Sequence, residues 1–214
     1  MDRKTRTNHL RKALADLYPN VYCTLEYENP LQLLVATQLA AQSTDAQVNI
    51  VTKNLFRKYR TAEDYAAVDL TELEQDIHAT GFFHNKAKNL KGCCIRLLQH
   101  HQGQVPGTME ELIALPGVGR KTANVVLGAI FQVPGVIVDT HAGRLSRRMG
   151  LTVEEDPAAV ERDLMKLLPK KEWTDFSHRL VFHGRAVCNA KKPLCGICTC
   201  RPYCAYGQKN VELG

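Results

Sequence analysis

The sequence predicts an all-α fold. Residue patterns typical of helix starts recur along most of the 214-residue chain. Apolar residues follow them at the three- and four-residue spacing of an amphipathic helix. We find no segment in which apolar and polar residues alternate, as they do in a half-buried strand, and no internal repeat. The chain is long enough to form one or two domains with their own cores, and no apolar run reaches the length that spans a bilayer.

The first half of the chain contains three clear helix starts. Asn29 before Pro30 is typical of an N-cap followed by proline at the first helical position, so we expect a buried helix over residues 31–41. Polar residues 43–45 precede a second helix, whose apolar side chains recur at helical spacing. Residues 61–64, TAED, have the pattern of a capping box at the start of a third.

Later helices are predicted by the same signals. We expect one over residues 85–100, a short one capped by residues 108–111 and ending near Leu115, and one that begins at the pair Asp156 and Pro157. A last long helix should follow it. The side chains that we expect to face inward share helical spacing within each segment and are Leu90, Cys94 and Leu97, then Val160, Leu164 and Leu167, then Phe176, Leu180 and Gly184.

A glycine turn lies between the short helix and the next apolar segment, in the sequence LPGVGRKTA at residues 115–123. Gly117 and Gly119 can adopt left-handed backbone conformations and let a ligand come close to the main chain. The turn would leave N–H groups pointing outward at the start of a helix, which is a site for an anion such as phosphate. A purely structural turn can have the same two glycines, but the basic pair Arg120 and Lys121 favours the anion site.

The charge of the chain is compatible with a polyanionic partner without requiring one. Lys and Arg outnumber Asp and Glu by 28 to 22, for a net charge of +6. The excess is concentrated between residues 115 and 151, where basic residues oppose only Asp139. These basic residues are Arg120, Lys121, Arg144, Arg147 and Arg148. Such a stripe suits a phosphate backbone, although an ordinary solvated face has the same composition.

A group of cysteines near the C-terminus predicts a metal centre, in the pattern Cys188-x6-Cys195-x2-Cys198-x5-Cys204. Residues 1–10 have no apolar core, so we expect no secretion signal and no disulfides. Zinc is the stronger alternative, but structural zinc sites usually bring two close-spaced pairs. A compact all-thiolate set also suits an iron–sulfur cluster, which the spacing alone favours modestly.

The other four cysteines are interpreted as bystanders. Cys200 lies between two of the predicted ligands and could replace a neighbour, so it stays an alternative ligand. We expect Cys23, Cys93 and Cys94 to be buried thiols.

Three motifs in this order resemble those of the helix-hairpin-helix base-excision DNA glycosylases. They are residues 115–123, the segment Val138-Asp139-Thr140-His141 and the four-cysteine pattern, and the resemblance covers about residues 31–204. The resemblance implies two helical domains with a DNA-binding groove between them, a helix-hairpin-helix motif and a C-terminal iron–sulfur cluster loop.

The resemblance also implies domain boundaries and a cofactor. A six-helix domain with the helix-hairpin-helix would cover residues 25–134. A discontinuous domain would combine residues 1–24 and 135–214, and its four-cysteine pattern would hold a [4Fe-4S] cluster.

The family's catalytic pair falls on Lys121 and Asp139. Base removal followed by strand scission needs an amine that attacks the sugar C1′ and forms a Schiff base, after which the adjacent proton can be lost in β-elimination. The helix N-terminus and Arg120 should lower the pKa of Lys121, which favours the neutral amine. Asp139 would open the helix that contains His141 and stabilise positive charge on the sugar. The alternatives are that Lys121 only neutralises a phosphate and Asp139 only caps a helix.

The resemblance assigns further residues to DNA contact. Gln42 falls where the family has a glutamine that enters the space left by an everted nucleotide, and Phe82 falls where a residue, often leucine, wedges between bases. By residue type alone, Gln42 would be a polar residue at a helix end and Phe82 a core aromatic. His141 could contact phosphate or support the helix cap. The other predicted contacts are Gly117, Gly119, Arg120, and Lys191 and Lys192 on a proline-containing loop.

We therefore predict a bifunctional DNA glycosylase and abasic-site lyase that removes oxidised or ring-saturated pyrimidines. Three alternatives stay open: a pyrimidine-dimer glycosylase with the same catalytic pair, an adenine-specific mismatch glycosylase, which usually lacks the lysine, and a non-catalytic iron–sulfur module that binds DNA or carries electrons. The predicted partner is double-stranded DNA with damaged bases or abasic sites, bound by a monomer with no membrane attachment. We expect a cytoplasmic, nucleoid-associated protein of a prokaryote.

Overall fold

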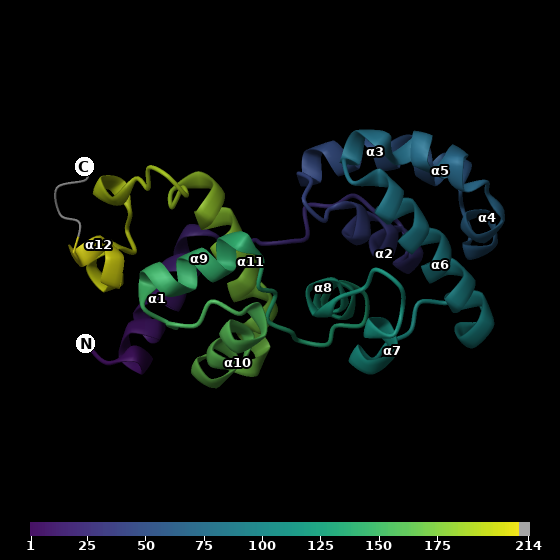
Figure 1. Cartoon of the computed structure of the whole chain (residues 1–214). Coiled ribbons are helices and arrows are strands. Elements are labelled where there is room, and N and C mark those ends of the chain that lie inside the picture. The colour runs from purple at the N-terminus through teal and green to yellow at the C-terminus, as the bar shows by residue number, and fades with distance from the viewer. Residues whose placement is uncertain (210–214) are drawn as a thin grey trace. The chain divides into compact units, whose positions relative to one another are not determined.

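The computed structural model describes residues 1–209, and all regular secondary structure in that range is helical (Figure 1). The helices are α1 (Arg3–Leu17), α2 (Pro30–Leu39), α3 (Asp45–Lys58), α4 (Ala62–Ala67), α5 (Leu70–Ile77), α6 (Phe83–His101), α7 (Met109–Ile113), α8 (Arg120–Ile130), α9 (Thr140–Met149), α10 (Pro157–Leu167), α11 (Trp173–Ala186) and α12 (Ala205–Lys209). Short 3₁₀ turns lie at His78–Thr80, Lys170–Glu172, Cys195–Ile197 and Arg201–Tyr203. Since no strand occurs in these residues, the all-α prediction is confirmed.

The described chain divides into two compact units. One is the continuous segment Cys23–Val133, which contains α2 to α8. The other is discontinuous and joins Met1–Tyr22 to the chain from Pro134 onward, with α1 and α9 to α12. Each unit buries its own apolar cluster, as domains do. None of the helices within residues 1–209 combines the length and apolar character that crossing a bilayer requires.

Side-chain caps set the helix starts in the continuous unit. Asn29 accepts a hydrogen bond from the Gln32 N–H at 3.0 Å before α2, and Thr44 accepts one from the Gln47 N–H at 3.2 Å before α3. The predicted capping box at the start of α4 is present as well. These starts are confirmed, while α2 ends at Leu39 and not at the predicted residue 41.

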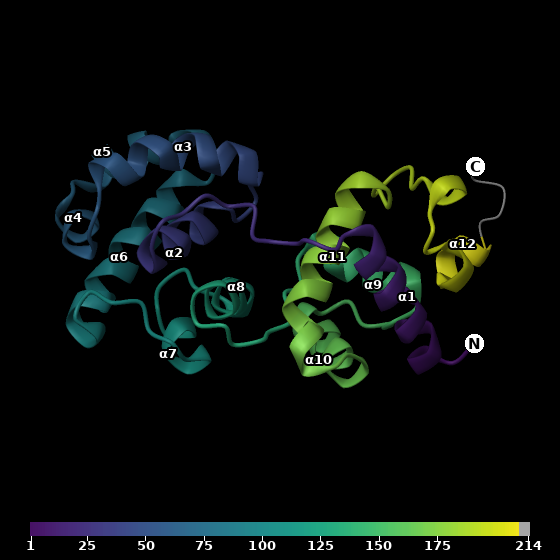
Figure 2. The same cartoon turned by 180° about the vertical axis from the view of Figure 1, so that it is seen from behind.

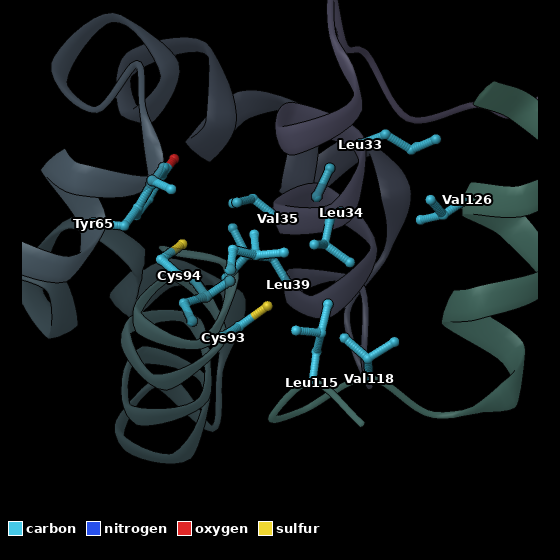
Figure 3. Packing of buried hydrophobic residues seen from close by; sticks show 14 of the residues in the cluster. Leu33, Leu34, Val35, Leu39, Tyr65, Cys93, Cys94, Leu115, Val118 and Val126 are labelled. Carbon is cyan, nitrogen blue, oxygen red and sulfur yellow. The ribbon is translucent and has the colours of Figure 1, made fainter. Parts of the chain in front are cut away.

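The helix α2 is the most buried element of this unit. All residues from Leu33 to Leu39 are buried, and α3, α6 and α8 contact this helix. Leu115 and Val118, from the turn between α7 and α8, belong to the same core as Leu39 (Figure 3). The apolar residues of the turn therefore hold the hairpin on the core, and its glycines are left at the surface.

The helix α11 is the central element of the discontinuous unit. The helices α1 and α9 pack against it, as both views show (Figures 1 and 2). The residues predicted to face inward from α11 are buried. On α10, Val160 and Leu164 are fully buried, whereas Leu167 is half-buried against the same core.

Candidate functional site

The turn between α7 and α8 uses its two glycines differently. Gly117 has a φ of +75°, and a Cβ there would stand 2.7 Å from Gln38 Oε1 and 2.8 Å from Asn89 Cβ, so both conformation and packing require glycine. Gly119 has a φ of −95°, and apart from its neighbours along the chain the described residues place no heavy atom within 4 Å of where its Cβ would lie. Of the two freedoms that glycine offers, Gly117 therefore uses the left-handed conformation and Gly119 leaves the main chain open to close approach.

The start of α8 is an open helix N-terminus. Gly119 occupies the N-cap position, and no side chain of the described residues caps the first turn. The side chains of Arg120 and Lys121, the first two residues of α8, are both exposed next to the backbone N–H groups of this turn. Backbone N–H groups, the helix dipole and two cationic side chains all favour an anion at this point.

Lys121 shares its surroundings with a thiol and a carboxylate of the same unit. Burial raises the pKa of Cys23, the charge of Asp45 raises it further, and the charge of Lys121 lowers it. The Asp45 carboxylate accepts a hydrogen bond from the Thr24 hydroxyl at the start of α3. The charges of Lys121 and Asp45 therefore both act on the Cys23 thiol, in the segment that leads into α2.

Asp139 is the N-cap of α9, and its carboxylate accepts a hydrogen bond from the Ala142 N–H at 2.7 Å. The side chain is half-buried. Burial lowers the pKa of both Arg144 and His178, and the negative charge of Asp139 acts in the opposite direction on each. Asp139 is thus a carboxylate held in a fixed position at the start of α9.

His141 follows in the first turn of α9 and contacts an arginine. Its Nδ1 lies 3.2 Å from Arg144 Nη2, which also donates to the carbonyl oxygens of Gly184 at 3.2 Å and Cys188 at 2.9 Å. The sequence left open whether His141 supports the helix cap or contacts phosphate. The cap of α9 is supplied by Asp139 itself. His141 is instead held against α11 through Arg144.

The fold divides the basic stripe that the sequence predicted. Arg148 is half-buried and donates to the carbonyl oxygens of Asn189 at 2.7 Å and Ala190 at 2.6 Å. Arg144 is turned to backbone carbonyls in the same way, whereas Arg147 is exposed. Two of these three arginines therefore hold the segment that begins the cysteine pattern, and a uniform phosphate-facing stripe is not formed.

Gln42 and Phe82 lie on two turns with the same uncommon backbone. Their φ angles are +54° and +49°, in the left-handed region, and both side chains are exposed, Phe82 to 64%. The residue-type expectation of a core aromatic at position 82 is therefore wrong. The two residues line an open pocket of about 590 Å³, and its other residues include Gln38, Asn85, Lys86, Asn89 and Gly117. Strained backbone of this kind concentrates at functional sites.

The four cysteines predicted to bind a metal centre line one pocket of about 340 Å³ in the discontinuous unit. They are Cys188, Cys195, Cys198 and Cys204. Arg148 Nη1 lies 3.5 Å from Cys188 Sγ, and the Gly207 N–H donates to Cys204 Sγ at 3.4 Å. N–H donors directed at sulfur stabilise thiolates that bind a metal. The donor set and its surroundings therefore fit a metal cluster.

Cys200 also lines this pocket but is fully buried in the core of the unit. The ligand atoms of His183, Cys198 and Cys200 lie within 4.8 Å of one another, and His183 Nε2 is 3.4 Å from Cys198 Sγ. Three such ligands could hold a single ion, so zinc stays the alternative to a cluster.

Lys191 and Lys192 are exposed on the loop that follows Cys188. Arg148 holds the preceding carbonyls, and the Leu194 N–H donates to the Val187 carbonyl at 3.0 Å. The loop is thus fixed at both ends, with two ammonium groups at the surface.

Comparison with known proteins confirms the resemblance that the sequence suggested. Residues 35–170 match the family described as HhH-GPD superfamily base excision DNA repair protein. The chain is 52% identical to endonuclease III of Synechocystis sp. over 209 residues, which are 97% of this chain and 95% of that protein. It is 46% identical to endonuclease III of Bacillus subtilis over 202 residues, which are 94% and 92% of the two chains.

A solved structure is also similar to this chain. It is described as a trapped endonuclease III–DNA covalent intermediate, an estranged-adenine complex, and matches with a TM-score of 0.95 at 45% identity, covering 99% of this chain and 100% of that chain. The chain therefore belongs to the HhH-GPD superfamily and, within it, to the endonuclease III family of base excision repair enzymes.

Proposed function

We propose that this DNA glycosylase and abasic-site lyase acts on oxidised and ring-saturated pyrimidines in duplex DNA. The observation that most supports this proposal is the open start of α8, where Lys121 follows the uncovered main chain of Gly119. A DNA phosphate can bind there, and a nucleophilic amine lies next to it. The similar endonuclease III structure with covalently trapped DNA supports DNA as the partner.

Lys121 is the proposed nucleophile. Its neutral Nζ would attack the sugar C1′ and displace the damaged base, whose departing nitrogen takes up a proton. The nitrogen then pushes its electron pair toward C1′ as the C1′–O4′ bond opens and O4′ takes up a proton, which gives a protonated imine. This imine makes the C2′ proton acidic, and loss of that proton with cleavage of the C3′–O bond breaks the strand. Water then hydrolyses the imine and restores the lysine.

Asp139 is the proposed electrostatic partner. Positive charge develops on the sugar as the base leaves, and a carboxylate held at a helix start can stabilise it. The hydrogen bond from the Ala142 N–H leaves the second carboxylate oxygen available for this role or for proton transfer. Lys121 belongs to the continuous unit and Asp139 to the discontinuous one, and we propose that these units are the two domains predicted from the sequence.

Gln42 and Phe82 are the proposed residues that replace the everted nucleotide. A base inside the duplex cannot reach a lysine, so the nucleotide must rotate out and leave a gap. The exposed ring and the strained turns support this assignment, since neither contributes to the core. Gly117, Gly119, Arg120 and His141 would contact the DNA backbone.

We further propose that Cys188, Cys195, Cys198 and Cys204 hold a [4Fe-4S] cluster. When bound, it would fix the loop geometry and could exchange an electron. Lys191 and Lys192 would then contact phosphates from a fixed position. Purified protein should contain about four irons per chain, and one zinc with no iron would exclude the cluster.

Borohydride trapping tests the proposed nucleophile. Wild-type protein should form a covalent adduct with duplexes that contain an oxidised pyrimidine, and Lys121→Ala should form none. Lys121→Arg is the matched control, because it retains a cation for phosphate but cannot form the Schiff base. If Lys121→Arg keeps strand scission, Lys121 only neutralises a phosphate.

A panel of duplexes with one defined lesion each would identify the substrate class. Oxidised pyrimidines should be processed fastest, whereas preference for a pyrimidine dimer or for an undamaged mismatch would favour the alternatives. We also propose that the protein acts as a monomer in the cytoplasm of a prokaryote, which the bacterial relatives support. Gel filtration of the purified protein tests the monomer.

A further inference from the structure

Lys86 is a buried ammonium that the proposed mechanism does not use. Its side chain is 6% exposed in the first turn of α6, and Nζ donates to the carbonyl oxygens of Leu39 and Thr80, each at 2.8 Å. Burial lowers its pKa, and no charged group among the described residues offsets this effect. Since burying a cation with only neutral partners is unfavourable, a specific role is expected.

The Leu39 and Thr80 carbonyls lie at the ends of the two segments that lead to Gln42 and Phe82. Leu39 is the last residue of α2, where a helix leaves its own carbonyls unsatisfied, and Thr80 is the last residue of a 3₁₀ turn. The Lys86 N–H also donates to the Phe82 carbonyl at 3.2 Å. A single residue therefore binds the main chain of both turns.

Both turns need such support. The φ angles of Gln42, +54°, and Phe82, +49°, are unfavourable for residues with a side chain. Conformations of this kind persist only where the surroundings fix them. Gln42, Phe82 and Lys86 line the same open pocket, so the two exposed side chains emerge at one opening with Lys86 behind them.

We propose that Lys86 is a positioning residue that fixes the spacing between the Gln42 and Phe82 turns, so that both side chains enter the base stack together when the damaged nucleotide leaves it. This inference rests on the DNA roles proposed above for Gln42 and Phe82. Lys86 would then affect extrusion of the base. It would not affect the chemistry of Lys121 at a sugar that is already accessible.

Three variants and two substrates test this separation. Lys86→Met removes the ammonium and keeps an unbranched apolar side chain, Lys86→Arg keeps charge and donors, and Lys88→Met removes an exposed ammonium from the same helix. A duplex with one dihydrothymine requires extrusion of the base. A single strand with one preformed abasic site has no base to extrude. Single-turnover rates on both substrates are measured beside the melting temperature of each variant.

We expect Lys86→Met to slow base removal from the duplex about tenfold or more and to change cleavage of the abasic strand by less than about twofold. Lys86→Arg should recover most of the duplex rate, and Lys88→Met should resemble the wild type on both substrates. An equal loss on both substrates, or an unchanged duplex rate, would overturn the proposal. If Lys86→Met does not fold, Lys86→Gln, which has one amide donor group, is measured in its place.

A double-mutant cycle supplies a readout that a merely structural role would not move. In a protein with Gln42→Ala and Phe82→Ala, Lys86→Met should slow base removal no further, because it acts through those two side chains. Full additivity would contradict the proposal. A wild-type protein that is inactive on both substrates would overturn the proposed function itself, and with it this inference.

Discussion

Gly184 on α11 lies directly against His141 on α9. A Cβ at position 184 would stand 2.8 Å from His141 Nδ1, which is shorter than real Cβ contacts, and 3.0 Å from its Cβ, which is tighter than most of them. Arg144 Nη2, which donates to the Gly184 carbonyl at 3.2 Å, would be 3.2 Å from the same point. The missing side chain at 184 therefore lets the helix that begins at Asp139 pack closely on α11.

Gly184→Ala should destabilise the discontinuous unit by about 1 to 3 kcal/mol, because His141 must move to admit the methyl group. Gly143→Ala on α9 is the matched control, since a Cβ there meets only ordinary contacts at 3.6 Å and 3.7 Å. Alanine is favoured over glycine in a helix by up to about 1 kcal/mol, so the control should be neutral or stabilising. Calorimetry distinguishes the two, and equal melting temperatures would show that the close approach is not needed.

The variant Asp139→Asn removes the negative charge at this position but keeps an oxygen that can cap α9. Asparagine can accept the same hydrogen bond from the Ala142 N–H, so we expect little change in stability. Base removal should nevertheless slow about 100-fold or more, because the charge on the sugar loses its partner. Asp139→Ala should lose about 1 kcal/mol of stability in addition. If Asp139→Asn keeps the wild-type single-turnover rate, the carboxylate is only a cap.

Arg148→Met should loosen the proposed cluster. The guanidinium holds two carbonyls of the cysteine loop and lies 3.5 Å from Cys188 Sγ, so its loss frees the loop around the first ligand. Iron release to a chelator should be several-fold faster than in the wild type, by roughly the effect seen when partners of metal ligands are removed. Arg147→Met removes a neighbouring exposed arginine and is the control. Identical release from both variants would mean that Arg148 does not stabilise the site.

Lys191→Ala combined with Lys192→Ala should reduce the salt dependence of DNA binding. Each phosphate contact contributes about 0.9 to the slope of log affinity against log salt concentration, so the double variant should be shallower by about 1.8. The pair Lys170→Ala and Lys171→Ala removes two exposed lysines from the same unit as a control. Equal slopes in the two double variants would remove the loop from the DNA interface.

The helices could be predicted wherever the signal is local. Asn29 and Thr44 lie at the starts that their residue types indicate, because a cap requires only a side chain and an N–H a few residues away. The helix α5 was missed, although Asp69 accepts from two N–H groups at its start and Leu73 and Ile77 face the core. Its eight residues give the periodic pattern too little length to stand out.

Candidate site residues could be predicted from the sequence where residue type and neighbouring residues indicate the role. They could not be predicted where the role depends on contacts between distant parts of the chain. Arg148 was read as part of a basic stripe, yet its partners lie more than forty residues later in the chain. Lys86 was not identified at all, since its burial depends on two carbonyls from separate turns. Such pairings depend on tertiary contacts that residue type and spacing do not contain.

The left-handed backbone at Phe82, together with the role in the base stack proposed for its ring, would place heat resistance and repair in conflict at one position. Glycine would relieve about 1 kcal/mol of strain at a φ of +49° and would remove an exposed aromatic ring. A laboratory screen for thermal tolerance should therefore enrich small residues at position 82. A screen for survival under oxidative damage should retain the ring, so the two selections would drive the same codon in opposite directions.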